Sequence, residues 1–249
     1  MAVLSSSFSS KVLDIRTSFH VILPEEFEGR LPVLYLLHGL SDDDTSWLQN
    51  SSIARYANKM AIAIVMPQVQ RSFYADMVEG GAYWTFLSEE LPALIQRWFP
   101  ISQKKEETFV AGLSMGGYGA LKWGLNYPEK FAGIASISGA VDLVGLWKDD
   151  ASRNREFTRI FGSLEELEGS QSDLVYLMNQ VKGQSNVPEI LQICGREDFL
   201  YHYNVKFSKQ LADLDFDSSW IEAQGTHNWE FWDYYIQTVL EWIETKLKK

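Results

Sequence analysis

The sequence predicts an α/β fold: a mostly parallel, doubly wound sheet with antiparallel strands at its N-terminal side and a small helical insertion. Several short, almost continuous apolar runs end in glycine, proline or a polar turn, as strands buried on both faces do. Amphipathic helical stretches alternate with these runs. With 249 residues, 46% of them hydrophobic, the chain can bury the core of such a sheet. We therefore expect one domain over residues 1–249.

The strands follow from two kinds of pattern. Residues 12–23 alternate apolar or β-branched side chains with polar ones, and this period of two predicts a half-buried antiparallel strand. Continuous apolar runs predict the buried parallel strands. These runs lie at 33–37, 61–66 and 109–111, and further strand candidates lie at 133–138, 190–194 and 220–223.

Helices are predicted between these strands and at the end of the chain. Residues 82–98 carry large apolar side chains at three- and four-residue spacing, and residues 115–125 directly follow a strand. Residues 230–247 form an amphipathic stretch that ends in lysines, which are favourable at a helix C-terminus. At about 140–188 polar, helix-like pieces interrupt the alternation, and we interpret them as an insertion over one end of the sheet.

The composition excludes several classes of function. The chain has 33 Asp and Glu against 22 Lys and Arg, a formal net charge of −11, so its surface repels nucleic acids and anionic membranes. No run of 18 apolar residues occurs, and the N-terminus does not resemble a signal peptide. The single cysteine, Cys194, allows no internal disulfide. We expect a cytoplasmic protein with no nucleic-acid or membrane partner.

The strongest motif is Gly112-Leu-Ser114-Met-Gly116, a Gly-x-Ser-x-Gly sequence between a predicted strand and a predicted helix. A serine in this position occupies a tight, strained turn that exposes its hydroxyl, and the flanking glycines leave room for the backbone. The motif therefore predicts an α/β-hydrolase fold with Ser114 as the nucleophile. A glycine-rich turn that only packs against the sheet is the alternative interpretation.

A serine hydroxyl is a weak nucleophile, so the hypothesis requires a histidine base. The chain has four histidines. His20 lies on the polar face of the early strand, His38 ends a buried strand upstream of the motif, and His202 lies among aromatic residues. In α/β-hydrolases the histidine comes last in the chain, in a loop after the final strand. Because His227 alone meets that position, we assign it as the base.

The acid that orients the histidine is expected in a loop after a strand, between the serine and the histidine. Glu197 and Asp198 are adjacent carboxylates in such a loop. We choose Asp198, because its shorter side chain suits a fixed hydrogen bond to imidazole, and we expect Glu197 to pair with Arg196 or to face water. A helix N-cap is the alternative role for Asp198.

Acyl transfer also needs donors for the negative oxygen of the tetrahedral intermediate. One is expected at Met115, directly after the nucleophile, and the other at Leu40, in the loop after the strand at 33–37. Aromatic residues near these loops are candidate walls of a substrate pocket, together with parts of the insertion. They are Trp47, Tyr74 and Trp229.

Eight short segments occur in an order shared with a known family. They are LYLLHGL at 34–40, SW at 46–47, VMP at 65–67, SFY at 72–74, EELP at 89–92, AGLSMGGY at 111–118, CGREDFLY at 194–201 and GTHNW at 225–229. In this order the chain resembles the bacterial tributyrin esterases, within the esterase D group of α/β-hydrolases. The resemblance spans nearly the whole chain.

This resemblance assigns the same residues to the reaction as the motif analysis does. It implies Ser114, Asp198 and His227 as the catalytic triad, and Leu40 and Met115 as the oxyanion hole. It also implies hydrolysis of small-molecule, short-chain acyl esters in the cytoplasm, with no metal and no organic cofactor. Relatives are often oligomers, so a homo-oligomer is expected as well.

One segment, residues 41–44, departs from the family pattern. Three carboxylates, Asp42, Asp43 and Asp44, stand beside the expected oxyanion loop, where relatives often carry a Gly-Asn type of turn. We interpret them as a solvated turn. The alternatives are that they disfavour anionic substrates or bind a cation weakly.

The leading functional hypothesis is a serine carboxylesterase with an acyl-enzyme on Ser114. A thioesterase such as an S-formylglutathione hydrolase, or an acyltransferase, would use the same residues. A non-catalytic binding protein on this fold is the alternative from a different class. Retention of the serine, the acid, the histidine and both oxyanion positions favours an enzyme.

Overall fold

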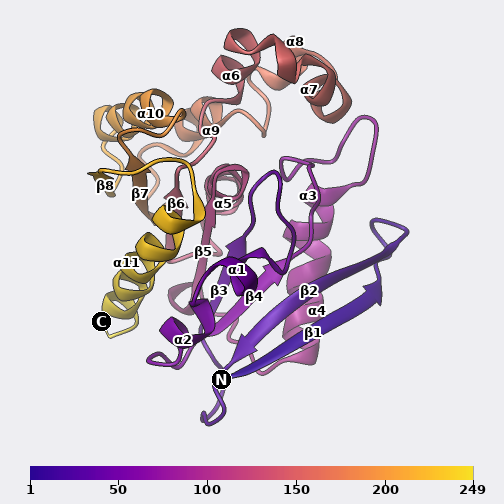
Figure 1. The fold of residues 1–249 in the computed structure, drawn as a ribbon, viewed down its shortest axis with the longest axis vertical. Helices are drawn as coiled ribbons and strands as arrows, with labels where there is room; N and C mark the ends of the chain where they lie inside the picture. The colour runs from indigo at the N-terminus through magenta and orange to yellow at the C-terminus, as the bar shows by residue number, and fades with distance from the viewer. Residues whose placement is uncertain (249) are drawn as a thin grey trace.

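A computed structural model describes residues 1–248, and its centre is one eight-stranded sheet (Figure 1). The strand order is β1-β2-β4-β3-β5-β6-β7-β8. The strands are β1 (Ala2–Ser9), β2 (Arg16–Leu23), β3 (Val33–Leu37), β4 (Ala63–Pro67), β5 (Thr108–Leu113), β6 (Gly133–Ile137), β7 (Glu189–Gly195) and β8 (Ser218–Ala223). Strands β3 to β8 are parallel, whereas β1 and β2 pair antiparallel at one edge. The predicted fold class is confirmed.

The helices connect and cover these strands. They are α1 (Ser46–Asn50), α2 (Ile53–Ala57), α3 (Tyr83–Thr85), α4 (Leu91–Trp98), α5 (Met115–Asn126), α6 (Leu143–Asp149), α7 (Asn154–Phe161), α8 (Leu164–Leu167), α9 (Leu174–Val181), α10 (Tyr201–Asp213) and α11 (Trp229–Leu247). Short 3-10 turns, η2 (Lys105–Glu107) and η3 (Ala151–Arg153), precede β5 and α7. Within residues 1–248 no helix combines the length and the apolar composition that crossing a bilayer requires.

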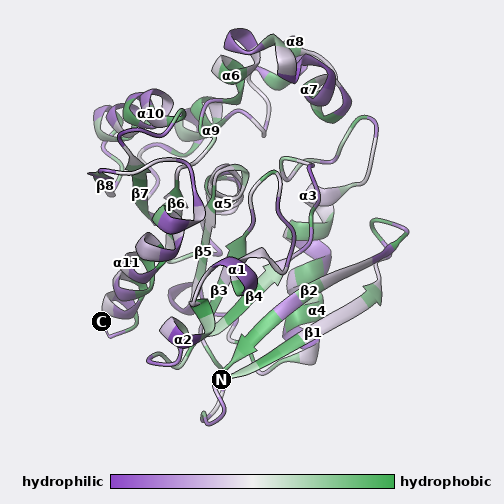
Figure 2. Cartoon of the chain, in the orientation of Figure 1, coloured by the Kyte–Doolittle hydropathy of each residue, from purple (hydrophilic) through white to green (hydrophobic). Residues whose placement is uncertain are grey.

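Side chains on the two faces of the sheet enter two separate cores, which explains the continuous apolar strands. In β3, Leu34 and Leu36 pack into a core that also contains residues of α2 and α11. The alternate residues Val33, Tyr35 and Leu37 pack into a second core with residues of α4 and α5. In Figure 2 the central strands are mostly hydrophobic, whereas the helices that cover them are of mixed hydropathy. A strand buried on both faces has no polar positions left to alternate.

The predicted elements differ from the observed ones mainly at the N-terminal edge. The antiparallel strands predicted at the N-terminal side are present, but the range of β1 was not predicted, because its serine-rich sequence is mostly exposed and carries little apolar signal. The strand predicted over 12–23 begins at Arg16, since the preceding residues form a turn in which Ser10 N–H bonds to the Ile15 carbonyl and Asp14 has φ 54°. Edge strands of this kind carry the weakest sequence pattern, because neither face is fully buried.

The helix predicted over 82–98 is present as three consecutive segments. Between α3 and α4 the chain widens into a π turn, η1 (Phe86–Glu90). Pro92 follows in the first turn of α4. Proline has no N–H and its ring conflicts with the carbonyl four residues earlier, so a wider turn just before it relieves that conflict.

Residues 140–188 form the predicted insertion, here called the cap. It leaves the carboxyl end of β6, carries α6 to α9, and returns to the neighbouring strand β7 (Figure 1). Two side chains of α5 hold the segment of the cap just before α9. The Tyr118 hydroxyl donates to the Ser172 carbonyl at 2.8 Å, and Lys122 Nζ donates to Ser172 Oγ at 3.0 Å. The buried Lys122 also donates to the Tyr74 carbonyl at 2.7 Å. The cap therefore lies over the edge of the sheet where the parallel strands end.

Candidate active site

Ser114 occupies the single-residue turn between β5 and α5. Its backbone has φ 52° and ψ −117°, a region that residues with a Cβ rarely adopt. The Ser114 N–H bonds to the Ile137 carbonyl at 2.9 Å, and its own carbonyl accepts from Tyr118 and Ala140. These backbone contacts from β6, α5 and the start of the cap hold the strained turn, which presents the hydroxyl at the N-terminus of α5.

The two glycines of the motif are required by close backbone contacts. A Cβ on Gly112 would lie 2.4 Å from the carbonyl group of Gly116, and a Cβ on Gly116 would lie 2.4 Å from the Leu37 carbonyl oxygen. Both distances are far below a van der Waals contact. The glycines thus let α5 begin directly against the ends of β3 and β5.

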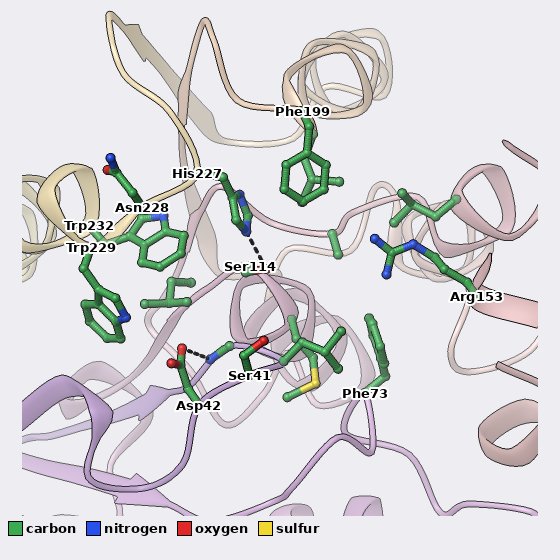
Figure 3. A pocket seen from close by; sticks show the side chains of 17 residues that line it. Ser41, Asp42, Phe73, Ser114, Arg153, Phe199, His227, Asn228, Trp229 and Trp232 are labelled. Carbon is green, nitrogen blue, oxygen red and sulfur yellow. Dashed lines mark hydrogen bonds between the residues drawn. The ribbon is translucent and has the colours of Figure 1, made fainter. Parts of the chain in front are cut away.

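The structure brings Ser114, His227 and Asp198 into one hydrogen-bonded chain, of which Figure 3 shows the bond between Ser114 and His227. His227 Nε2 lies 2.9 Å from Ser114 Oγ, and His227 Nδ1 lies 2.8 Å from Asp198 Oδ2. For Nε2 to accept the serine proton, Nδ1 must carry the ring proton and donate it to the carboxylate. The Asp198 side chain is fully buried, and its other oxygen accepts from the Leu200 N–H at 2.8 Å.

The loop that carries His227 is held from both sides. Glu197 Oε2 accepts from the Gly225 N–H at 2.6 Å, and the Glu197 N–H donates to the Gly225 carbonyl at 3.1 Å. Of the two expectations for Glu197, the pairing with Arg196 is wrong, because Arg196 contacts Glu222 at 2.9 Å, whereas exposure of Glu197 to water is confirmed. Glu197 anchors the histidine loop while its neighbour contacts the imidazole.

Leu40 and Met115 both line the pocket, and both N–H groups are available to a ligand. Met115 is the first residue of α5, so its N–H has no acceptor within the helix. No acceptor for the Leu40 N–H is found within residues 1–248. The carbonyl of the same Gly39–Leu40 peptide accepts from His38 Nδ1 at 2.7 Å and from the Asp42 N–H at 3.3 Å. In a trans peptide the N–H points opposite to the carbonyl, so these bonds, of which the one from His38 is the shorter, set the direction of the Leu40 donor.

His38 supports the oxyanion loop as a neutral side chain. It is almost completely buried, and its Nε2 accepts from the Val69 N–H at 3.2 Å, so the ring proton resides on Nδ1. Burial lowers the pKa of His38, which keeps the imidazole neutral. The ring therefore accepts on one side and donates to the Gly39 carbonyl on the other.

The acidic run at 42–44 is a structured turn, which corrects the expectation of a solvated one. Asp42 Oδ2 accepts from the Gly39 N–H at 3.2 Å, and burial raises the pKa of this carboxyl. Asp43 Oδ1 accepts from the Thr45 N–H at 2.8 Å. Asp44 is buried and contacts His20 Nδ1 at 3.2 Å. Within residues 1–248 these carboxylates do not form a cluster of three metal ligands.

A cavity of about 510 Å³ opens in front of Ser114. Its lining includes residues 39–42, in the loop after β3 that carries the expected oxyanion donor, and residues 227–228, in the loop before α11. The cap and the first turn of α11 supply further lining residues. Of the three predicted wall residues only Trp229 lines it. In Figure 3, Asp42, Trp229 and Trp232 lie on one side of Ser114, whereas Phe73 and Arg153 lie on the other. The cavity thus has two sides, as an ester with an acyl part and an alcohol part requires.

Trp47 and Tyr74 lie behind the pocket lining, which corrects their assignment as walls. Trp47 is buried, donates from Nε1 to the Leu37 carbonyl at 3.1 Å, and packs edge-on against Trp229. Tyr74 is also buried and donates from its hydroxyl to the His38 carbonyl at 2.8 Å. Both aromatic residues support the strand end that leads into the oxyanion loop, because their polar atoms bond to its backbone.

Sequence reasoning did not identify four further lining residues, Phe73, Arg153, Phe199 and Trp232. The Phe199 ring centroid lies 4.5 Å from that of His227, and the Trp232 centroid lies 4.9 Å from it. Phe199 directly follows Asp198, and Trp232 lies in the first turn of α11, just after His227. This closeness in sequence to the expected catalytic residues could have identified both as pocket residues. No comparable signal exists for Arg153, since the path of the cap is not readable from its sequence.

Comparisons with known proteins agree with this geometry. The model of the family described as "Putative esterase" matches residues 10–243. An acetyl esterase of Caldicellulosiruptor saccharolyticus is 34% identical over 261 residues, which cover 98% of each chain. Among solved structures, the substrate-bound serine hydrolase FphF of Staphylococcus aureus is similar with a TM-score of 0.91 and 32% identity, over 97% of this chain and 98% of that one.

A second solved structure, the S-formylglutathione hydrolase FrmB of Staphylococcus aureus, is similar with a TM-score of 0.88 and 32% identity, again over 97% and 98% of the two chains. The expected relation to esterases is thus confirmed at the level of the family. The chain belongs to this esterase family and is a serine hydrolase that acts on carboxylic ester bonds.

Proposed function

We propose that the protein, as one α/β-hydrolase domain, hydrolyses short-chain acyl esters, from acetyl to butyryl esters and including tributyrin-type substrates, through an acyl-enzyme on Ser114. The observation that carries this proposal is the hydrogen-bonded chain from Ser114 through His227 to Asp198, at a cavity with two unpaired N–H donors. The similarity to an acetyl esterase supports a short acyl group.

In the first step the Ser114 oxygen attacks the ester carbonyl carbon while its proton moves to His227 Nε2. The carbonyl electrons move to oxygen, and the resulting oxyanion accepts hydrogen bonds from the Leu40 and Met115 N–H groups. Loss of one such donor costs about 3 to 4 kcal/mol of transition-state stabilisation. Asp198 stabilises the imidazolium through Nδ1–H and remains ionised.

In the second step the tetrahedral intermediate collapses and the bond to the alcohol oxygen breaks. The alcohol leaves with the proton from His227 Nε2, and the acyl group stays on Ser114. Water then attacks the acyl-enzyme, with His227 taking its proton and returning it to the serine oxygen. These steps balance with side chains, backbone N–H groups and water, so we propose no cofactor.

A thioester hydrolase is the second candidate. The observation that favours it is the likeness to an S-formylglutathione hydrolase over nearly the whole of both chains. The same residues would act in the same order, with a thiolate in place of the alkoxide as leaving group. The attacking groups are common to both reactions, so the shape of the pocket decides between them.

The test is hydrolysis of p-nitrophenyl esters from acetate to octanoate, beside acetyl and formyl thioesters. Wild type is compared with Ser114→Ala and with Ser5→Ala, a control on the exposed edge strand β1. We expect short-chain ester turnover in wild type and the control, loss of turnover in Ser114→Ala, and a decline beyond butyrate. Turnover of thioesters alone would select the second candidate, and turnover that survives in Ser114→Ala contradicts both.

A further inference from the structure

The cap places a cation in the wall of the cavity. Arg153 ends the 3-10 turn η3, directly before α7, and among the described lining residues it is the only Lys or Arg. Its side chain is 21% exposed, which is low for a guanidinium. Figure 3 shows the guanidinium directed into the cavity from the side opposite Trp229.

Most donors of Arg153 are not used by the protein. Its Nε is buried and forms an ion pair with Asp150 Oδ2 at 3.1 Å, i,i+3 along the chain, without the geometry of a hydrogen bond. The other oxygen of Asp150 already accepts from the N–H and hydroxyl of Ser152. Nor does any described residue accept from the two terminal Nη groups. A guanidinium has five N–H donors in a fixed fork, so most of its capacity faces the cavity unpaired.

Apart from Asp150, the groups around Arg153 are apolar and compensate little for its lost hydration. Phe73, Leu146 and Leu200 line the same cavity, and the Phe157 ring lies 6.0 Å from the guanidinium carbon. A partly desolvated guanidinium with a single ion-pair partner leaves most of its donors unsatisfied, and an anionic ligand would offset that cost. A planar fork of donors matches a carboxylate in particular.

The opposite side of the cavity has the reverse charge. Asp42 lies beside Trp229 and is the only carboxylate among the lining residues that the structure describes. A negative group on a bound ester would be repelled there and attracted toward Arg153. The two charges therefore also fix which way round such an ester binds.

We propose that Arg153 is a specificity-determining residue that binds a carboxylate at the far end of the substrate, so that the preferred esters carry an acid on the part that lies toward the cap. This proposal rests on the proposed esterase function. The acid can belong to the acyl part or to the alcohol part, and the two sources are distinguished by separate arms of one experiment.

The acyl arm compares the monoethyl esters of succinate, glutarate and adipate with ethyl butyrate, valerate and hexanoate. The alcohol arm compares 4-acetoxybutyrate with butyl acetate. Within each pair a terminal methyl group replaces the carboxylate, which is ionised at pH 7.5. Titration of released acid at constant pH gives kcat/KM for every substrate without a chromogenic group.

The variants are Arg153→Met, Arg153→Lys and the control Arg155→Met. Arg155 is an exposed arginine in α7, two residues further on, and does not line this cavity. We expect wild type to prefer the carboxylate member of the pairs in one arm. Arg153→Met should lower that preference by roughly ten- to hundred-fold, the size of a charge-assisted hydrogen bond. Arg153→Lys should retain part of it, and Arg155→Met should keep it all.

The inference is overturned if wild type hydrolyses every carboxylate ester more slowly than its neutral partner, or if Arg153→Met lowers both members of a pair by the same factor. Hydrolysis of p-nitrophenyl acetate in the same preparations separates this result from failure of the proposed function. If that ester is hydrolysed through Ser114, only the role of Arg153 is overturned; if it is not, the esterase proposal itself fails.

Discussion

The floor of the site and the cap above it differ in how far side chains hold them in place. In the floor, main-chain groups position the reacting atoms: the Ser114 turn is fixed by backbone bonds and by glycines that touch neighbouring carbonyls. The cap also makes main-chain bonds, such as the one from the Glu79 N–H to the Arg159 carbonyl at 2.8 Å. Side chains supply many of its other attachments, such as Lys206 to Asp142 at 2.8 Å and Tyr203 to Asp149 at 2.6 Å.

This difference separates two tasks of an esterase. Groups that stabilise the transition state must keep their positions to within a fraction of an ångström, and backbone geometry provides that rigidity. Groups that select the substrate lie on elements whose side chains can change while the sheet stays intact. Three substitutions, ordered from the largest expected effect to the smallest, test whether the two regions are as separate as their contacts suggest.

Asp198→Asn should lower kcat by roughly four orders of magnitude, because an amide in place of the carboxylate favours the wrong tautomer of His227. Steady-state hydrolysis of p-nitrophenyl acetate measures the loss. Asp142→Asn is the matched control, since Asp142 is the N-terminal capping residue of α6 and pairs with Lys206. A loss of kcat below tenfold in Asp198→Asn would show that another group orients His227. Glu197 is the carboxylate nearest to Asp198 in sequence.

His38→Leu should lower kcat by about tenfold to a hundredfold with little change in KM, because the Gly39–Leu40 peptide loses the shorter of the bonds that direct the Leu40 donor. His38→Asn keeps a side-chain donor near the position of Nδ1 and should restore part of the rate. Kinetics of both variants, together with their unfolding midpoints, provide the test. Equal losses of kcat in the two variants would mean that His38 acts only through packing.

Lys122→Met should leave kcat near wild type at pH 7.5 but change how stability depends on pH. Burial lowers the pKa of Lys122 from 10.5 to about 7 in the folded protein. Between these values the unfolded chain binds the proton and the folded chain does not, so the free energy of unfolding rises with pH. The rise is about 1 kcal/mol per pH unit.

Urea unfolding at pH 7, 8, 9 and 10 measures this slope in wild type and in Lys122→Met. The variant should lack the Lys122 contribution, so its free energy of unfolding should rise less steeply with pH than that of wild type. A neutral amine still has two N–H donors, enough for the bonds to Tyr74 and Ser172. Parallel curves would show that the lysine stays charged in the folded state.

The sequence predicted the fold, and the three residues that it proposed as a triad lie together in one hydrogen-bonded chain. The reasons lie in local patterns of the chain. A buried strand such as β3 has apolar residues at every position, and Ser114 lies between two required glycines. Such local patterns need no knowledge of distant residues. The range of strand β1 was not predicted, because its exposed serines have no such pattern.

The walls of the pocket could not be predicted in the same way. Trp47 and Trp229 are both aromatic residues near strand ends, yet one lies behind the lining and the other lies in it. Their roles differ through tertiary packing alone. Arg153 reaches the cavity because the cap folds back over it, which depends on contacts between segments far apart in the chain.

The cap begins and ends at two strands that are neighbours in the sheet, β6 and β7. The register between them is set by the strands themselves, so the gap could be closed by any loop long enough to cross from one to the other. A segment inserted at such a junction can vary in sequence and length without a change in strand order, so changes in substrate selection can be confined to it while the strand ends that carry Ser114 and Asp198 keep their places.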